Sequence, residues 1–222
     1  MKTKALLLAG LVTLAGVAAS EAQTVYSVNA VGFVNVTAPV GFSMIANPLA
    51  TANATVATLL PGMPNNTKLF KFNPATGSFV INTYRTALSN WTDPTMTLAP
   101  GEGAFFQNVT AAPMVLTFTG EVIQGNAGDA QTTVNLPTGF AIVSSVIPQS
   151  GQLDTVLSFP VGQNDKVYRF DNASNNYVIY TYRNGAWLGG NIPSPAVGES
   201  FFSQKVSGTT WQRSFSLNTP AS

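Results

Sequence analysis

An internal repeat runs through most of this chain. Residues 68–85, KLFKFNPATGSFVINTYR, match residues 166–183, KVYRFDNASNNYVIYTYR, position for position, and residues 39–47 match residues 137–145 at the same offset. Two copies with equivalent apolar positions must bury equivalent cores. The sequence therefore predicts two similar lobes, and we expect them to pack against each other.

Each copy has the pattern of a β protein. The segments KLFKFN and SFVINTYR are rich in β-branched and aromatic residues, and the turn residues NPATG between them predict a hairpin. Further short apolar runs bring each copy to roughly six strands. The segments TVATLL and LDTVLSF, ended by Pro61 and Pro160, predict one short helical turn per copy. We expect an all-β fold of two tandem pseudo-repeats, each a small β-sandwich or partly open barrel.

The chain divides into four segments. It begins with two lysines, an apolar run and small residues, the pattern of a cleaved secretory signal peptide. The stretch IQGNAGDAQ is rich in glycine and has no apolar period, as in a linker. The expected segments are a signal peptide at 1–22, lobe one with an N-terminal strand at 23–122, the linker at 123–131 and lobe two at 132–222. We expect a secreted protein, extracellular or at the cell surface, with no transmembrane segment.

Charge is sparse and balanced. Only 9% of the residues are charged, against roughly 25% in an ordinary soluble domain. After residue 22 the chain has eight basic and eight acidic side chains. Nucleic-acid binding needs a basic surplus, so we expect no nucleic-acid partner. Weak charge repulsion between molecules suits a protein that assembles or adheres.

The chain has no histidine and no cysteine. This excludes Ser–His–Asp and Cys–His catalysis, an imidazole general base and the usual zinc ligands. We expect no cofactor, no metal site and no catalytic residue. The acids are scattered, and only Glu102 and Glu199 hold the same place in both copies. A glycoside-active enzyme, which needs two carboxylates across one bond, is a distant alternative.

The repeated charges and aromatic residues are the candidate site residues. Arg85 and Arg183 end the second hairpin strand of each copy, so we expect ion pairs of Arg85 with Glu102 and of Arg183 with Glu199 that fasten turn to hairpin.

Four aromatic residues also recur between the copies: Tyr84, Tyr182, Trp91 and Trp187. If exposed, these rings would stack on sugars, which makes an extracellular polysaccharide a candidate partner. The alternative interpretation is that they belong to the lobe cores, since tryptophan is usually mostly buried.

The motif GEGAFF from Gly101 returns as GESFF from Gly198. It leads into a strand and has no basic neighbour, so it predicts a turn followed by a core strand rather than a phosphate-binding loop. Together with GFSMIANPL, the motif resembles a repeat of secreted β proteins of environmental bacteria, in which Gly-aromatic and I-x-N-P precede Pro-Gly-x-Gly-aromatic. Copy two departs from this pattern at VSSVIP and at Ser200. The resemblance implies secretion and an all-β repeat, and it implies no chemistry.

The N-terminal segment TVYSVNAVGFVNVT is longer than the opening strand of copy two. It predicts an edge strand of lobe one or, as the alternative, a strand donated to another copy of the chain. From these patterns we expect a non-enzymatic extracellular protein that acts by adhesion or self-assembly. A carbohydrate-binding module is the alternative.

Overall fold

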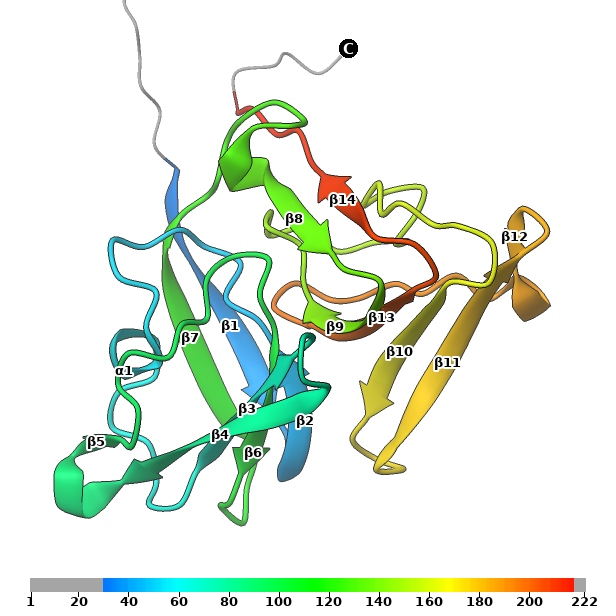
Figure 1. The fold of residues 1–222 in the computed structure, drawn as a ribbon. Coiled ribbons are helices and arrows are strands. Elements are labelled where there is room, and N and C mark those ends of the chain that lie inside the picture. The colour runs from blue at the N-terminus through cyan, green and yellow to red at the C-terminus, as the bar shows by residue number, and fades with distance from the viewer. Residues whose placement is uncertain (1–29, 218–222) are drawn as a thin grey trace, which may run out of the picture.

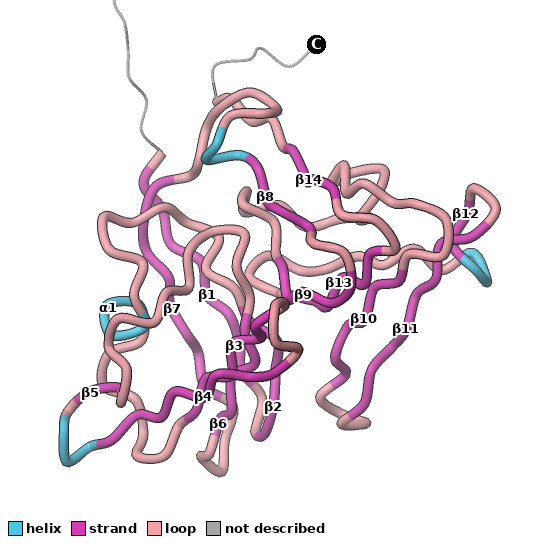
Figure 2. Tube along the Cα trace, viewed as in Figure 1, coloured by secondary structure: helices cyan, strands magenta, loops and turns pink. Residues whose placement is uncertain are grey.

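The computed structural model describes residues 30–217, and within them the fold is all-β, as the sequence predicts (Figure 1). The predicted signal peptide and residues 23–29 of the predicted N-terminal strand lie outside the described residues. Helical structure is confined to short turns, and loops connect most strands (Figure 2). Residues 30–217 contain no helix long and apolar enough to cross a membrane.

Lobe one is built from two antiparallel sheets. The larger has the strand order β2-β6-β3-β4-β5, and β1 and β7 form a two-stranded ribbon. The elements are β1 (Val31–Ala38), β2 (Gly41–Ile45), α1 (Val56–Leu59), β3 (Lys68–Asn73), β4 (Ser78–Arg85), the 3-10 turn η1 (Thr86–Leu88), β5 (Asn90–Trp91), β6 (Ala104–Asn108) and β7 (Met114–Glu121).

Lobe two repeats this arrangement strand for strand. Its larger sheet has the order β9-β13-β10-β11-β12, and β8 pairs with β14. The elements are η2 (Ala130–Thr132), β8 (Thr133–Leu136), β9 (Gly139–Val143), β10 (Lys166–Asp171), β11 (Asn176–Arg183), β12 (Ala186–Trp187), η3 (Leu188–Gly190), β13 (Phe201–Lys205) and β14 (Thr209–Gln212). The helical turn predicted before Pro61 is α1. Its counterpart in lobe two forms consecutive turns instead, and Ser158 there has a positive φ of 54°.

The two sheets of each lobe pack face to face as a small sandwich. In lobe one, Leu69 of β3 and Phe106 of β6 meet Leu116 and Phe118 of the ribbon in one fully buried cluster. Side chains alternate between the faces of a strand, so the residues between these point out of the core. Lobe two buries an equivalent cluster in which two β-sheets also share the core: Val134, Leu136, Val143, Val167, Phe201 and Trp211.

The lobes meet through an aromatic cluster, and a pseudo-two-fold axis relates the rings of one lobe to those of the other. Phe105 and Phe202, equivalent residues of β6 and β13, lie at its centre with ring centroids 6.3 Å apart. Phe72 contacts Phe202 at 5.2 Å, and the equivalent pair, Phe170 and Phe105, also lies at 5.2 Å. The cluster contains five equivalent pairs of rings: Phe42 and Phe140, Phe70 and Tyr168, Phe72 and Phe170, Phe79 and Tyr177, and Phe105 and Phe202. The repeats therefore form one pseudo-symmetric body.

Backbone hydrogen bonds cross the same junction in equivalent pairs. The amide of Ala46, just after β2, donates to the carbonyl of Gly198 at 2.8 Å. Its counterpart, the amide of Ser144 after β9, donates to the carbonyl of Gly101 at 3.0 Å. Each lobe's Gly-Glu turn thus extends the edge of the other lobe's sheet, which locks the orientation of the lobes.

In each lobe, the first and last segments of the chain lie side by side and are joined by backbone hydrogen bonds. At the start of lobe one, the carbonyl of Ala30 accepts from the amide of Val122 at 2.9 Å. In lobe two, Gly125 and Phe215 exchange two backbone hydrogen bonds of 3.0 Å. The predicted linker 123–131 is therefore partly ordered against the end of lobe two.

Candidate functional site

The repeated Gly-Glu motif forms the junction between the lobes. Gly101 and Gly198 have φ values of +89° and +78°, which favour glycine. They also lie against the opposite lobe: a Cβ on Gly101 would be 2.9 Å from Val134 Cγ2, and one on Gly198 would be 2.3 Å from Val36 Cγ2. The motif predicted as a turn is therefore also a contact surface, with no space for side chains at either glycine.

The two aromatic positions of the motif serve different cores. Phe106 and Phe201 point into the cores of their own lobes, whereas Phe105 and Phe202 point into the aromatic cluster between the lobes. This division follows from the strand period of two, because adjacent residues face opposite sides of the sheet. Sequence alone places one of these rings in a core without showing that its neighbour joins the lobes.

The ion pairs of the motif differ from the predicted ones. Glu102 pairs with Lys71 of β3 at 2.6 Å, and Glu199 pairs with Arg169 of β10 through two hydrogen bonds of 2.7 and 2.8 Å. The hydrogen bonds that Arg169 donates to Glu199 outweigh the opposing desolvation, and they raise the pKa of Arg169. Each carboxylate also accepts a hydrogen bond from the backbone amide three residues before it in the turn: Glu102 from Ala99, and Glu199 from Ala196.

The predicted pairs of Arg85 with Glu102 and of Arg183 with Glu199 were wrong because of strand register. Pairing of Lys68 with Thr83 places Arg85 beside Asn66, to which its guanidinium donates a hydrogen bond. The register of β3 with β6 places Glu102 at the other end of β3, roughly 20 Å away along the strand. Arg183 holds the matching position on β11.

Trp91 and Tyr84 belong to the core of lobe one and offer no face to a sugar. Trp91 is 1% exposed, its indole N–H donates to the carbonyl of Leu60 at 2.9 Å, and Tyr84 packs edge-on against it at 5.7 Å.

The equivalent residues of lobe two, Trp187 and Tyr182, pack against each other in the same way. Trp187 is 5% exposed, donates to Asp154 Oδ2 at 2.9 Å and packs against Tyr182 at 5.4 Å. The expected glycan-stacking role is thereby corrected for Trp91, Trp187 and Tyr84, which are buried core residues. Tyr182 is half-buried and packs on the core of lobe two.

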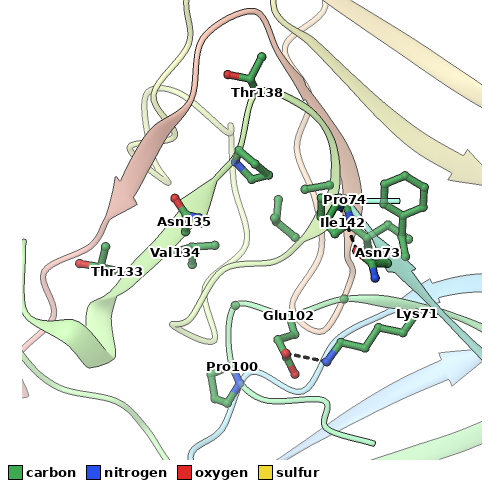
Figure 3. Close-up of a pocket in the computed structure, with 17 residues that line it drawn as sticks. Lys71, Asn73, Pro74, Pro100, Glu102, Thr133, Val134, Asn135, Thr138 and Ile142 are labelled. Carbon is green, nitrogen blue, oxygen red and sulfur yellow. Dashed lines mark hydrogen bonds and ion pairs between the residues drawn. The ribbon is translucent and has the colours of Figure 1, made fainter. Parts of the chain in front are cut away.

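A groove of about 730 Å³ lies between the lobes on one side of the junction (Figure 3). Thr133 and Asn135 of β8 form one side, and Asn73 and Pro74 at the tip of the β3–β4 hairpin lie on the other. The Pro100–Gly103 turn forms part of its lining, and the Lys71–Glu102 pair lies there (Figure 3). The side chains include amides, hydroxyls and proline rings, and the volume is in the range of small-molecule sites.

The pseudo-two-fold axis relates this groove to a smaller one of about 330 Å³ between β1 and the tip of the β10–β11 hairpin. Asn172 at that tip donates to the carbonyls of Val40 and Phe42, at 3.0 and 2.8 Å. Pro74 occupies the equivalent position in the larger groove and has no donor. One groove is therefore latched by a side chain, and the other is open.

The outer strands of both hairpins have an open edge. Within residues 30–217, β5 pairs only with Tyr84 and Arg85 of β4, so no strand covers the outer side of residues 78–81. β12 covers only the matching end of β11 and leaves residues 176–179 open. Both open stretches are rich in apolar side chains.

One buried ion pair was not found by sequence reasoning. Asp165 and Lys205 are paired deep in lobe two, and Lys205 also donates to the carbonyl of Pro160 at 2.7 Å. The equivalent positions in lobe one are Thr67 and Asn108, both uncharged. The sequence does contain a sign of this pair: two neutral residues of copy one are replaced by residues of opposite charge at the matching positions of copy two.

Comparison of the chain with protein-family models, with curated proteins and with solved structures gave no match.

Proposed function

We propose that this chain is a secreted, non-enzymatic protein that acts outside the cell by assembling with further copies of itself. The signal-peptide pattern of the sequence supports secretion. The carboxylates of Glu102 and Glu199, the repeated acids, each have an ion-pair partner and a backbone donor, which suits a structural role.

The open edge of β4 carries the proposal. Phe79, Val80 and Ile81 are consecutive exposed apolar residues on it, and Ile81 is 56% exposed. Unpaired backbone N–H and C=O groups along such an edge are a template for pairing with another chain. Natural proteins protect exposed edges with lysine, proline or bulges, and residues 78–81 contain no charge and no proline.

The edge of β11 repeats the arrangement in lobe two. Tyr177, Val178 and Ile179 occupy the positions of the three β4 residues, and Ile179 is 57% exposed. A protein with one such edge would stop at a dimer. Two edges on opposite sides of a pseudo-two-fold axis make each molecule bivalent, and pairing edge to edge then gives an open chain of molecules.

The test is the concentration dependence of molecular mass of the mature protein, residues 23–222, by sedimentation velocity. We expect species that lengthen with concentration. Ile81→Lys or Ile179→Lys alone should stop growth at the dimer, because each leaves one edge, and the double variant should be monomeric. Val115→Lys is the control: this residue is exposed on β7, away from both edges, and should assemble normally.

Two results would overturn the proposal. One is a monomeric mature protein at all concentrations. The other is assembly that survives the double variant and is lost on deletion of residues 23–29, which would assign it to the N-terminal strand instead of to β4 and β11.

A further inference from the structure

We propose that the open groove between the β3–β4 hairpin, the Pro100–Gly103 turn and β8 binds a neutral oligosaccharide. This inference is independent of self-assembly, because the groove is lined by no residue of the open edges at 78–81 and 176–179. It rests on the divergence of the two related grooves, on the chemistry of the lining and on its charge.

The two grooves differ at the tip of the hairpins, where Pro74 beside the open groove corresponds to Asn172 beside the closed one. In the closed groove, the Asn172 amide spans the gap and bonds to the carbonyls of Val40 and Phe42. The equivalent carbonyls beside the open groove belong to Thr138 and Phe140, and Pro74 has no N–H with which to reach them. The open groove is more than twice the size of its twin, and it keeps its hydrogen-bonding groups available.

The lining matches sugar hydroxyls. Asn135 is exposed, and its side chain has no hydrogen bond to any residue within 30–217. Among the residues that the structure describes, the Asn73 side chain makes one hydrogen bond, in which its oxygen accepts from the amide of Ala75 at 2.9 Å. Both amides can thus donate, Asn135 can also accept, and the hydroxyl of Thr138 adds a donor. Phe72, Pro74 and Pro100 supply apolar surface of the kind that packs on the C–H faces of a sugar ring.

The charges of the groove favour a neutral ligand. Lys71 bonds to Glu102 Oε1 at 2.6 Å, to Thr97 Oγ1 at 2.8 Å and to the carbonyl of Thr97 at 3.1 Å, so its three donors are occupied. Glu102 accepts from Lys71 and from the backbone. An anionic ligand would have to break this network to gain a partner, and a cationic one would compete with Lys71 for Glu102.

The test is a titration of the mature protein, by calorimetry, with glucose and N-acetylglucosamine oligomers of various linkages and with a uronic acid oligomer. We expect binding of at least one neutral oligomer and none of the uronate. Asn135→Ala should weaken binding by roughly tenfold, the value of one or two hydrogen bonds. Thr37→Ala is the matched control, because Thr37 lies in the closed groove at the position equivalent to Asn135.

The latch provides a second, independent variant. Pro74→Asn introduces the residue that closes the twin groove and should abolish binding, whereas Pro74→Ala, which cannot latch, should retain it. Circular dichroism and the thermal midpoint of each variant establish that it is folded. The proposal is overturned if no neutral oligomer binds, if the uronate binds more tightly, if Thr37→Ala weakens binding as much as Asn135→Ala, or if folded Pro74→Asn binds normally.

Discussion

Gly103 and Ser200 occupy the same position of the two repeats, and they face each other across the pseudo-two-fold axis. A Cβ on Gly103 would lie 2.3 Å from the Cβ of Ser200 and 2.6 Å from Ile142 Cγ2. The junction has room for one side chain at this pair of positions. This explains the change from GEGAFF to GESFF, which in the sequence looks like a weakened motif.

Gly103→Ala should therefore destabilise the protein by about 1–3 kcal/mol, the usual cost of overpacking. Removing the facing side chain by Ser200→Gly should restore most of that loss in the double variant. Urea denaturation of the four proteins in this cycle measures the coupling. Additive effects of the two substitutions would contradict the contact.

The buried pair of Asp165 and Lys205 supports a second prediction. Lys205→Met leaves the Asp165 carboxylate buried without its cation and should lower the free energy of unfolding by about 3–5 kcal/mol. The joint substitution Asp165→Thr with Lys205→Asn, the residues of lobe one, should cost much less. Thermal unfolding followed by circular dichroism distinguishes the two, and equal losses would argue against a buried ion pair.

The corrected ion pairs give a third. Arg169→Ala removes two charge-assisted hydrogen bonds to half-buried Glu199 and should cost about 1–3 kcal/mol. Arg183→Ala, at an exposed position, should cost less than about 1 kcal/mol. Chemical denaturation compares them, and the reverse order would restore the pairing first expected from the sequence.

The core tryptophans give a fourth. Trp91→Ala should destabilise lobe one by about 3–5 kcal/mol, because it leaves a cavity and an unpaired carbonyl at Leu60. Oligosaccharide binding by any Trp91 variant that remains folded, such as Trp91→Phe, should be unchanged. Loss of binding with an unchanged thermal midpoint would instead return this residue to a ligand site.

Alkaline titration tests the aromatic cluster. Partial burial raises the pKa of Tyr168 and Tyr177 above the usual value near 10. Their phenols are neutral in the folded protein at a pH where the unfolded chain has already lost these protons. The free energy of unfolding should therefore fall as pH rises above about 10 and through the folded pKa values. Tyrosinate absorbance should show two late transitions, one of which Tyr177→Phe removes.

Much of the fold follows from sequence patterns alone. The repeat, the hairpins and the all-β class are local properties, since alternation of apolar residues and turn residues such as NPATG specify them. The Arg85–Glu102 prediction failed because it depended on how β3 and β6 align, and strand register is a nonlocal property. Arg85 and Glu102 lie at opposite ends of the β3–β4 hairpin, so they are not close enough to pair, although both charges recur in the second copy.

The candidate groove could not be predicted from the sequence, for a different reason. The groove exists only because the lobes pack around a pseudo-two-fold axis, and the lining comes from segments about 60 residues apart, such as Asn73 and Asn135. One signal was available: Pro74 and Asn172 differ at matched positions of the two hairpin segments, but so do several of their neighbours. Its meaning depended on what Asn172 contacts, which only the structure shows.

The adjoining ends of each lobe bear on how such a chain can grow. Lobe one closes where Ala30 meets Val122, and lobe two closes where Gly125 meets Phe215. An additional copy inserted directly after Val122 would therefore leave these closing contacts of both lobes in place. The aromatic residues of the added copy would have no second lobe to pack against, however, because those of the two present lobes already pack against each other. Longer relatives built from this unit should contain even numbers of copies, gained as whole pairs.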